Sequence, residues 1–332
     1  MSRSRAWISG LLLSCAAWCG GTAQAYSEMV VFGDSLSDNG NVYQVLQGAL
    51  PASPYWNGRY SNGPVAAEIM ANQLGLSLVD LAYGGATTGT GSLFYGVQDT
   101  LATTGMANQV SGYISSQSGS VRSDALYMLW GGGNDFLSVM SVGSPSLFLQ
   151  VGQMAVANLG NEVRQLYQAG ARDFFVPLLP DLAYTYYGTS GYYAPGSLSL
   201  ISQLFNTGLQ SELSTLASTY SDARITVFDT ATFLSGVRAD LQAQGGNVTD
   251  PCWLGNYLGG GTSTPVCANP DRYALFDAVH PTAYVHDRLG QAFAATVLAV
   301  EPVAQVPEPS TVSLAVFGGL LLLWVVRRRA PG

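Results

Sequence analysis

Five short apolar runs, separated by longer segments with helical spacing, constrain the fold of this chain most strongly. The runs lie at residues 29–32, 76–81, 125–130, 173–177 and 224–228. They are continuous rather than alternating, which is typical of parallel strands buried on both faces. Helical spacing occurs at residues 64–74, 147–169, 197–219 and 282–299. This alternation predicts a single α/β domain with a mostly parallel sheet.

The loops after the first three predicted strands combine glycines with polar side chains. They read G-D-S-L-S-D-N-G at 33–40, G-G-A-T-T-G at 84–89 and G-G-G-N-D at 131–135. Ligands bind beyond the carboxyl ends of the strands in open α/β sheets, so the three loops are expected to meet in one crevice. For any one loop taken alone, glycines in a tight strand-to-helix turn are the favoured explanation. Three such loops at one edge favour a functional site.

Only two histidines, His280 and His286, are available as a catalytic base. Asp277 precedes His280 by three residues, just before a predicted helix, where a carboxylate can hold one ring nitrogen and leave the other for a serine. A serine needs such a base because its hydroxyl is hardly ionised at neutral pH. His286 has Ala283 at the corresponding position and is interpreted as a surface or packing residue. A metal site from Asp277, His280, His286 and Asp287 is not expected, because histidines six residues apart do not share one helical face.

The composition excludes several classes of protein. Only 10% of the residues are charged and 48% are hydrophobic, which excludes a disordered chain. The formal net charge is −8 and there is no basic patch, which argues against a nucleic-acid binder. Two histidines cannot supply a three-histidine zinc site.

The amino terminus predicts a secretory signal peptide over residues 1–25. A basic start is followed by an apolar run at 6–19 and by A-Q-A at 23–25, the pattern of a cleaved leader. The run is too short for a transmembrane anchor, and a lipoprotein signal ending at Cys15 would leave a shortened apolar core. Signal peptidase would then release the domain that we expect over residues 26–300.

The carboxyl terminus has a second sorting pattern after a linker at 301–306. V-P-E-P-S at 306–310 is followed by apolar residues at 312–326 and by three arginines at 327–329. The uncharged stretch predicts a transmembrane segment at 312–326 with the arginines in the cytoplasm. A permanent tail anchor is one interpretation.

The order of these features over 307–332 resembles the PEP-CTERM sorting signal of Gram-negative bacteria. That resemblance implies transient inner-membrane anchoring, processing by an exosortase, and export to the periplasm, cell surface or extracellular matrix.

Cys15 and Cys19 would leave with the leader, so Cys252 and Cys267 are the cysteines of the exported chain. An even pair in an exported protein predicts a disulfide. The loop between them is rich in glycine and turn-forming residues, which such a bond would stabilise. Their separation lacks the paired spacing of zinc ligands.

Four motifs in order resemble the GDSL, or SGNH, hydrolase superfamily. They are G-D-S-L at 33–36, L-A-Y-G-G-A-T-T at 81–88, G-G-N-D at 132–135 and D-x-x-H-P-T at 277–282. Shorter matches at 177–182, 205–209 and 267–273 are similar to the lipase and acyltransferase branch. Asp80 departs from the pattern, since many relatives have asparagine there. The resemblance implies a flavodoxin-like three-layer αβα sandwich around a mostly parallel five-stranded sheet.

The resemblance also implies residue roles. Ser35 would be the nucleophile, His280 the general base and then acid, and Asp277 the residue that orients His280. The oxyanion would be held by the backbone N–H groups of Ser35 and Gly85 and by the side-chain amide of Asn134. No metal or organic cofactor is implied. The adjacent Asp34 is interpreted as a residue that tightens the turn.

These roles predict an exported serine esterase or lipase acting on a small-molecule or lipid ester, with no nucleic-acid partner. An acyltransferase with the same triad and a non-catalytic matrix-binding module are the alternatives. Aromatic side chains near the first motif and after the fourth predicted strand either line an acyl pocket or are ordinary packing and loop residues. They are Tyr43, Tyr55, Trp56, Tyr60, Tyr184, Tyr186, Tyr187, Tyr192 and Tyr193.

Overall fold

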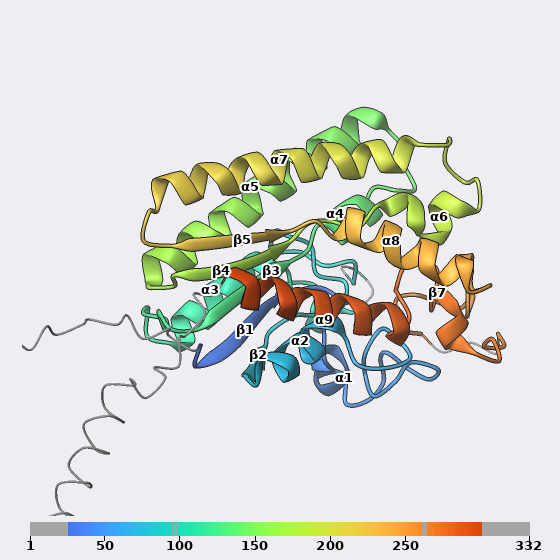
Figure 1. Ribbon diagram of the computed structural model, residues 1–332, viewed down its shortest axis with the longest axis horizontal. Helices are drawn as coiled ribbons and strands as arrows, with labels where there is room; N and C mark the ends of the chain where they lie inside the picture. The colour runs from blue at the N-terminus through green and yellow to red at the C-terminus, as the bar shows by residue number, and fades with distance from the viewer. Residues whose placement is uncertain (1–25, 95, 97, 261–263, 301–332) are drawn as a thin grey trace, which may run out of the picture. The chain divides into compact units, whose positions relative to one another are not determined.

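The computed structural model describes residues 26–94, 96, 98–260 and 264–300 (Figure 1). All five predicted strands belong to one parallel sheet with the order β2-β1-β3-β4-β5. The strands are β1 (Glu28–Gly33), β2 (Ser77–Asp80), β3 (Leu126–Trp130), β4 (Asp173–Pro177) and β5 (Arg224–Phe228). The expected α/β class is therefore confirmed.

The strand order places the functional loops next to one another. The chain moves from β1 to β2 on one side and then returns to β3 on the other side of β1, so the direction of winding switches between β1 and β3. Gly33 at the end of β1 pairs with Trp130 at the end of β3. The loops that follow these two residues start at the same level, at the switch point where open α/β sheets bind ligands.

Helices cover both faces of the sheet, giving the expected three layers (Figure 1). One face carries α2 (Ala66–Leu74), α8 (Thr230–Ala243) and α9 (Ala283–Val300), and the other carries α3 (Met106–Ser116), α5 (Pro145–Ala169) and α7 (Ser197–Thr219). Successive strand side chains point to opposite faces. In β1, Val30 and Phe32 therefore pack in one hydrophobic cluster and Met29 and Val31 in the other. Two buried faces explain why the apolar runs are continuous.

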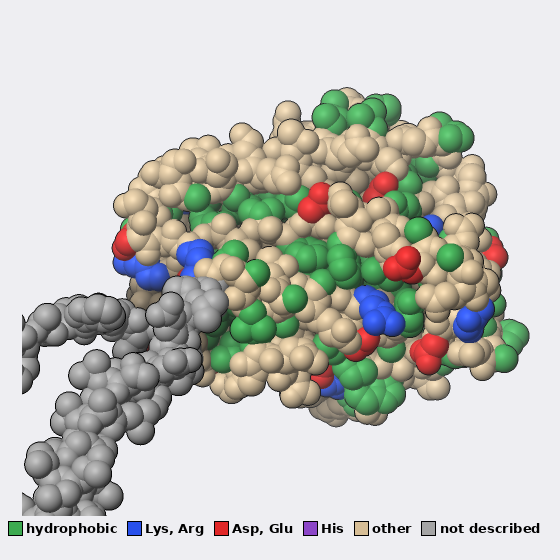
Figure 2. Space-filling view, in the orientation of Figure 1, with side chains coloured by type: hydrophobic (Ala, Val, Ile, Leu, Met, Phe, Trp, Pro, Cys, Tyr) green, Lys and Arg blue, Asp and Glu red, His purple; other side chains and the backbone are tan. Residues whose placement is uncertain are grey.

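Several elements were not expected from the sequence. They include α3, α8 and a separate parallel pair made of β6 (Asn247–Pro251) and β7 (Tyr273–Leu275). The short helices are α1 (Asn41–Val45), α4 (Gly133–Leu137), α6 (Tyr186–Thr189), η1 (Asp99–Leu101), η2 (Leu182–Tyr184) and η3 (Pro270–Arg272). Strand β5 forms one edge of the main sheet, and Figure 2 shows apolar side chains along it between α7 and α9. The pair β6-β7 leads directly into the segment that contains Asp277 and His280.

The expectation of a transmembrane protein is corrected. Across the residues that the structure describes, no helix has both the length and the apolarity needed to cross a membrane. The segment 312–326, on which that expectation rested, lies outside the described residues, as do the leader at 1–25 and the linker at 301–306.

Candidate active site

Ser35 lies in a tight turn immediately after β1. The carboxylate of Asp34 accepts a hydrogen bond from the Leu36 N–H at 3.0 Å. The Asp34 carbonyl accepts from the N–H groups of Ser37 and Asp38 at 3.0 and 2.9 Å. Asp34 therefore closes the turn, as expected, and holds Ser35 at the carboxyl end of the sheet. Burial raises the pKa of Asp34 to about 7.

Ser35, His280 and Asp277 are connected by hydrogen bonds in that order. The Nε2 atom of His280 lies 2.7 Å from the Ser35 Oγ, and its Nδ1 atom lies 2.6 Å from the Asp277 Oδ2. The other carboxylate oxygen of Asp277 accepts hydrogen bonds from the backbone N–H groups of Val279 and His280, each at 2.8 Å. Because a carboxylate only accepts, Nδ1 carries the proton and Nε2 is free to accept the serine proton.

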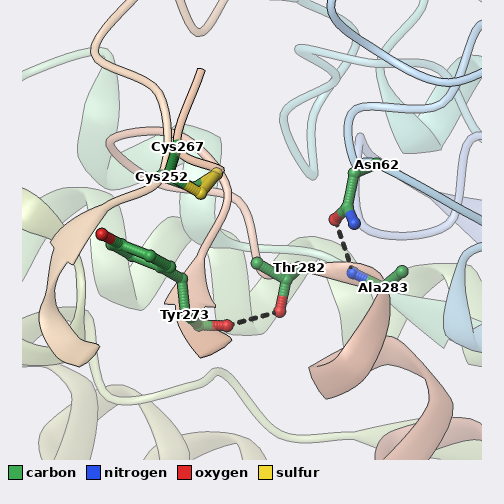
Figure 3. The surroundings of a disulfide bond; sticks show 6 residues. All are labelled: Asn62, Cys252, Cys267, Tyr273, Thr282 and Ala283. Atoms are coloured by element: carbon green, nitrogen blue, oxygen red, sulfur yellow. Dashed lines mark hydrogen bonds between the residues drawn. A yellow bond between two sulfur atoms is a disulfide. The ribbon is translucent and has the colours of Figure 1, made fainter. Parts of the chain in front are cut away.

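The segment around His280 is anchored at both ends. Before it, β7 pairs with β6. After it, the Thr282 hydroxyl donates to the Tyr273 carbonyl at 2.7 Å, and the Ala283 N–H donates to the Asn62 side chain at 2.8 Å (Figure 3). Thr282 and Ala283 thus attach the start of α9 to β7 and to the segment between α1 and α2. This fixes the backbone that carries the histidine.

A disulfide joins Cys252 to Cys267 beside this segment (Figure 3). The Cys252 N–H donates to the Leu275 carbonyl at 2.9 Å, and the Trp253 N–H donates to the Phe276 carbonyl at 2.8 Å. The disulfide therefore closes a loop whose first residues extend the pairing with β7 up to the residue before Asp277. The disulfide therefore lies next to the backbone that positions Asp277.

Tyr55 contacts the site in a way that sequence reasoning missed. Its hydroxyl donates to the same Asp277 oxygen that faces His280. Its ring is buried and meets Trp253 and Phe276 edge-on at centroid distances of 5.3 and 5.5 Å. Burial and the adjacent carboxylate raise the Tyr55 pKa, so the phenol stays protonated and donates. No local sequence signal marks this contact, because it joins residues 222 positions apart.

Gly85 and Asn134 lie in the same cleft as Ser35. Gly85 has φ +79°, and a Cβ there would approach the Phe94 ring to 2.9 Å, so the position requires glycine. The Asn134 amide donates to the Ala86 carbonyl at 2.9 Å, which fixes its orientation and leaves its second N–H. Among the described residues, the backbone N–H groups of Ser35 and Gly85 have no acceptor. These donors could stabilise a negative oxygen beside Ser35.

Two buried aspartates hold the second motif loop in place. Asp38 accepts the Gly84 N–H at 2.8 Å, and Asp135 accepts the Thr88 N–H and hydroxyl at 3.0 and 2.8 Å. Burial raises the pKa of both carboxyls to about 6. Asp38 lies in the first loop, just after the first motif, and Asp135 lies in the third motif, so each connects Gly84–Thr88 to a neighbouring segment. Their supporting role could be recognised only from the fold.

Asp80 occupies the position where the motif often has asparagine. One of its oxygens accepts the Ala82 N–H at 2.9 Å, and the other is buried without a partner. Burial raises the Asp80 pKa well above its usual range. A neutral carboxyl can therefore replace the amide without placing a buried charge beneath the second motif.

The cleft beside Ser35 has a cavity volume of about 100 Å³ and is partly open to solvent. Apolar side chains dominate its lining, including Leu93, Phe94, Leu234, Val285 and Leu289. Of the aromatic residues considered from the sequence, Tyr60 and Tyr184 line the cleft. An apolar lining of this kind could accommodate an acyl chain.

His286 is a packing residue rather than a surface one. It is fully buried, and its Nδ1 accepts the Ala66 N–H at 3.2 Å while Nε2 has no partner. Burial lowers its pKa to about 3, which keeps the ring neutral. Within the described ranges, no group of three or more potential ligands could hold a metal ion.

Comparisons with curated proteins identify similar enzymes. Phosphatidylcholine-sterol acyltransferase of Aeromonas hydrophila is 38% identical over 116 residues, which are 34% of each chain. Lipase 1 of Photorhabdus luminescens is 32% identical over 193 residues, covering 56% of this chain and 27% of the lipase. The chain spans 27% to 61% of the length of these two and two further relatives. Among solved structures, phospholipase A1 of Streptomyces albidoflavus NA297 has a TM-score of 0.45 and 18% identity, with 84% of this chain and 100% of that chain covered.

Two family models match separate parts of the chain. The model of the PEP-CTERM protein-sorting motif matches residues 305–329, which implies an exported protein of a Gram-negative bacterium. The model of the GDSL-like Lipase/Acylhydrolase matches residues 29–293 and so covers the sheet, the cleft and all four motifs. The chain therefore belongs to the GDSL-like lipase/acylhydrolase family.

Proposed function

We propose that this protein is an exported serine esterase or lipase that hydrolyses carboxylic esters through an acyl-serine intermediate. The observation that carries the proposal is the 2.7 Å contact between the Ser35 Oγ and the His280 Nε2, with Asp277 on the other side of the ring. Family membership supports a hydrolase, and the apolar cleft supports an acyl substrate.

In the acylation step, the Ser35 Oγ attacks the ester carbonyl while His280 accepts the serine proton. Asp277 stabilises the imidazolium that results. Negative charge develops on the former carbonyl oxygen, where the N–H groups of Ser35 and Gly85 and the amide of Asn134 would receive it. His280 then protonates the departing alcohol, and an acyl-serine remains.

In the deacylation step, water donates a proton to His280 and attacks the acyl-serine carbonyl. The same three donors stabilise the second tetrahedral intermediate. Collapse returns the proton to the Ser35 Oγ and releases the carboxylic acid. An alcohol that replaces this water would make the enzyme an acyltransferase, which remains the alternative. Adding an acceptor alcohol and measuring acylated product against free acid separates the two reactions.

We further propose the processing of the exported chain. Signal peptidase would remove residues 1–25 and leave the catalytic domain at 26–300. The linker at 301–306 would then precede the sorting signal at 307–332, which an exosortase would recognise. The family match to residues 305–329 supports this order.

The test of the catalytic assignment is Ser35→Ala. We expect hydrolysis of p-nitrophenyl butyrate to fall at least about 10⁴-fold, because the nucleophile and its base act as a unit. Labelling of the protein by a fluorophosphonate should also disappear.

Ser37→Ala is the matched control. Ser37 lies in the same turn, and its buried hydroxyl has no hydrogen-bond partner. Its loss should leave hydrolysis and labelling intact. Labelling that persists in Ser35→Ala would show that another residue is the nucleophile.

A further inference from the structure

Arg238 differs from the other arginines of the described chain in its surroundings. Five arginines pair with a carboxylate within 4.0 Å, namely Arg59, Arg122, Arg164, Arg172 and Arg224. Among the described residues, Arg238, Arg272 and Arg288 form no ion pair. Arg272 and Arg288 are exposed, whereas Arg238 is partly buried and lines the cleft that contains Ser35.

Arg238 contacts Tyr184, and the segment of Tyr184 is in turn hydrogen-bonded to the segment that carries His280. Its guanidinium carbon lies 4.2 Å from the centre of the Tyr184 ring, within the range of a cation–π contact. Two residues after Tyr184, the Tyr186 N–H donates to the Ala278 carbonyl at 2.8 Å. Tyr184, Arg238 and His280 all line the cleft. Arg238 therefore lines the same cleft as the candidate nucleophile Ser35 and the candidate base His280.

The carboxylate of Asp181, which also lines the cleft, forms no ion pair with Arg238 within 4.0 Å. Its Oδ1 accepts the Ala183 N–H at 2.9 Å, and its Oδ2 accepts the Ser199 hydroxyl at 2.7 Å. Burial lowers the pKa of Arg238, whereas Tyr184 and Asp181 act in the opposite direction. An arginine remains charged at neutral pH even so. A cation partly removed from water without an acceptor is costly, and an anionic ligand would offset that cost.

The walls around Arg238 are apolar. Leu234 lies one turn earlier on α8, and Val285 and Leu289 of α9 complete this side of the cleft. The cleft therefore combines an apolar lining with one unpaired guanidinium. The planar fork of a guanidinium suits the paired oxygens of a phosphate or a carboxylate.

We propose that Arg238 is a specificity residue that binds an anionic phosphate or carboxylate group on the substrate. The preferred substrates are then acyl esters whose alcohol part carries such a group, with the acyl chain in the apolar part of the cleft. This inference rests on the proposed ester hydrolysis and adds the substrate class to it.

Three esters with one acyl chain test the proposal. They are 1-decanoylglycerol 3-phosphate, 3-decanoylglycerate and neutral 1-decanoylglycerol, used below their aggregation limits. In Arg238→Met, which keeps the apolar stem, kcat/KM should fall about 10- to 100-fold for the anionic group that Arg238 binds, the range expected for a lost charge-assisted hydrogen bond. The neutral ester should change less than about threefold, the scatter that context gives to contacts of this kind. The anionic ester with the larger loss identifies the group as phosphate or carboxylate.

Arg238→Lys and Arg288→Met are the companion variants. Lysine keeps the charge without the fork, so it should recover part of the preference for the anionic ester. Arg288 is exposed on α9 and does not line the cleft, so Arg288→Met should match the wild type although it removes the same charge. Equal effects of Arg238→Met on the anionic and neutral esters would overturn the inference.

A failure of the proposed function would be recognised separately. It would appear as a wild-type protein that hydrolyses none of the three esters. Calorimetric titration with decyl phosphate and with decanoate then tests Arg238 alone. Tighter binding of either anion to the wild type than to Arg238→Met supports the anion site, and equal binding of both refutes it.

Discussion

At the scale of single residues, Asp277 accepts hydrogen bonds from Tyr55 and from two backbone N–H groups in addition to the one from the His280 ring. It accepts the N–H groups of Val279 and His280 through one oxygen, and the His280 Nδ1–H and the Tyr55 hydroxyl through the other. Tyr55 and His280 share one carboxylate oxygen, so the phenol fixes where that oxygen lies relative to the ring. We infer that Tyr55 acts through Asp277 as a positioning residue.

Tyr55→Phe tests this role. Phenylalanine keeps the ring packing against Trp253 and Phe276 but removes the donor to Asp277. We expect kcat to fall about 5- to 50-fold with KM nearly unchanged, because a misplaced base affects only the chemical step. Tyr127→Phe is the control, since it also removes a buried hydrogen-bonded tyrosine hydroxyl but lies outside the cleft. An unchanged kcat in Tyr55→Phe would limit this tyrosine to packing.

The residues that could be predicted from the sequence are those with distinctive chemistry at the ends of strands. Ser35, Gly85, Asn134 and the Asp277–His280 pair all lie within a few residues of the end of a strand. In the structure Ser35, Gly85, Asn134 and His280 line one cleft, and Asp277 contacts His280 from behind. Tyr55, Asp38 and Arg238 make contacts with distant segments, and such contacts leave no periodic or spacing signal in the sequence. Their surroundings depend on which segments, far apart in the sequence, the fold places side by side.

At the scale of elements, the strands were more predictable than the helices around them. Burial on both faces gives a strand a continuous apolar run, and each of the five runs became a strand of the main sheet. Helix α8 does have Leu234, Val237 and Leu241 at helical spacing, but threonine, serine and glycine weaken its helix propensity. The pair β6-β7 is short, and β6 is largely polar, so neither strand has the apolar run that predicts a strand from sequence.

The double variant Cys252→Ser/Cys267→Ser tests the contribution of that loop. Removing the cross-link restores freedom to the unfolded chain, and we expect the free energy of unfolding to fall by about 3 kcal/mol. Urea denaturation at neutral pH measures the loss. Wild-type protein treated with a reductant should match the double variant. Full stability of the reduced wild type would show that the hydrogen bonds to β7 suffice without the disulfide.

At the scale of the whole molecule, buried acids and a buried histidine change the free energy of unfolding with pH in opposite directions. Burial raises the pKa of Asp34 to about 7 and those of Asp38 and Asp135 to about 6. The folded state then binds these protons more tightly than the unfolded state, so the contribution is fully present below the ordinary aspartate pKa and is lost as pH rises through about 6 to 7. His286 has the opposite sign, because its pKa falls to about 3 and its contribution is lost as pH falls below the ordinary histidine pKa.

Glu162→Gln isolates one of these groups. Glu162 is 1% exposed on α5, neither of its carboxyl oxygens has a partner, and burial raises its pKa well above the ordinary glutamate value. Its folded form therefore prefers the proton, and deprotonation destabilises the fold increasingly as pH rises. Glutamine has nearly the same shape and cannot ionise, so the free energy of unfolding should fall less with pH in the variant than in the wild type. Urea denaturation between pH 7 and pH 9 avoids the range in which His286 titrates, and the three aspartates are common to both proteins. A difference between the two proteins that stays constant over this range would mean that Glu162 is already ionised in the folded protein at pH 7, which would contradict a pKa raised above this range.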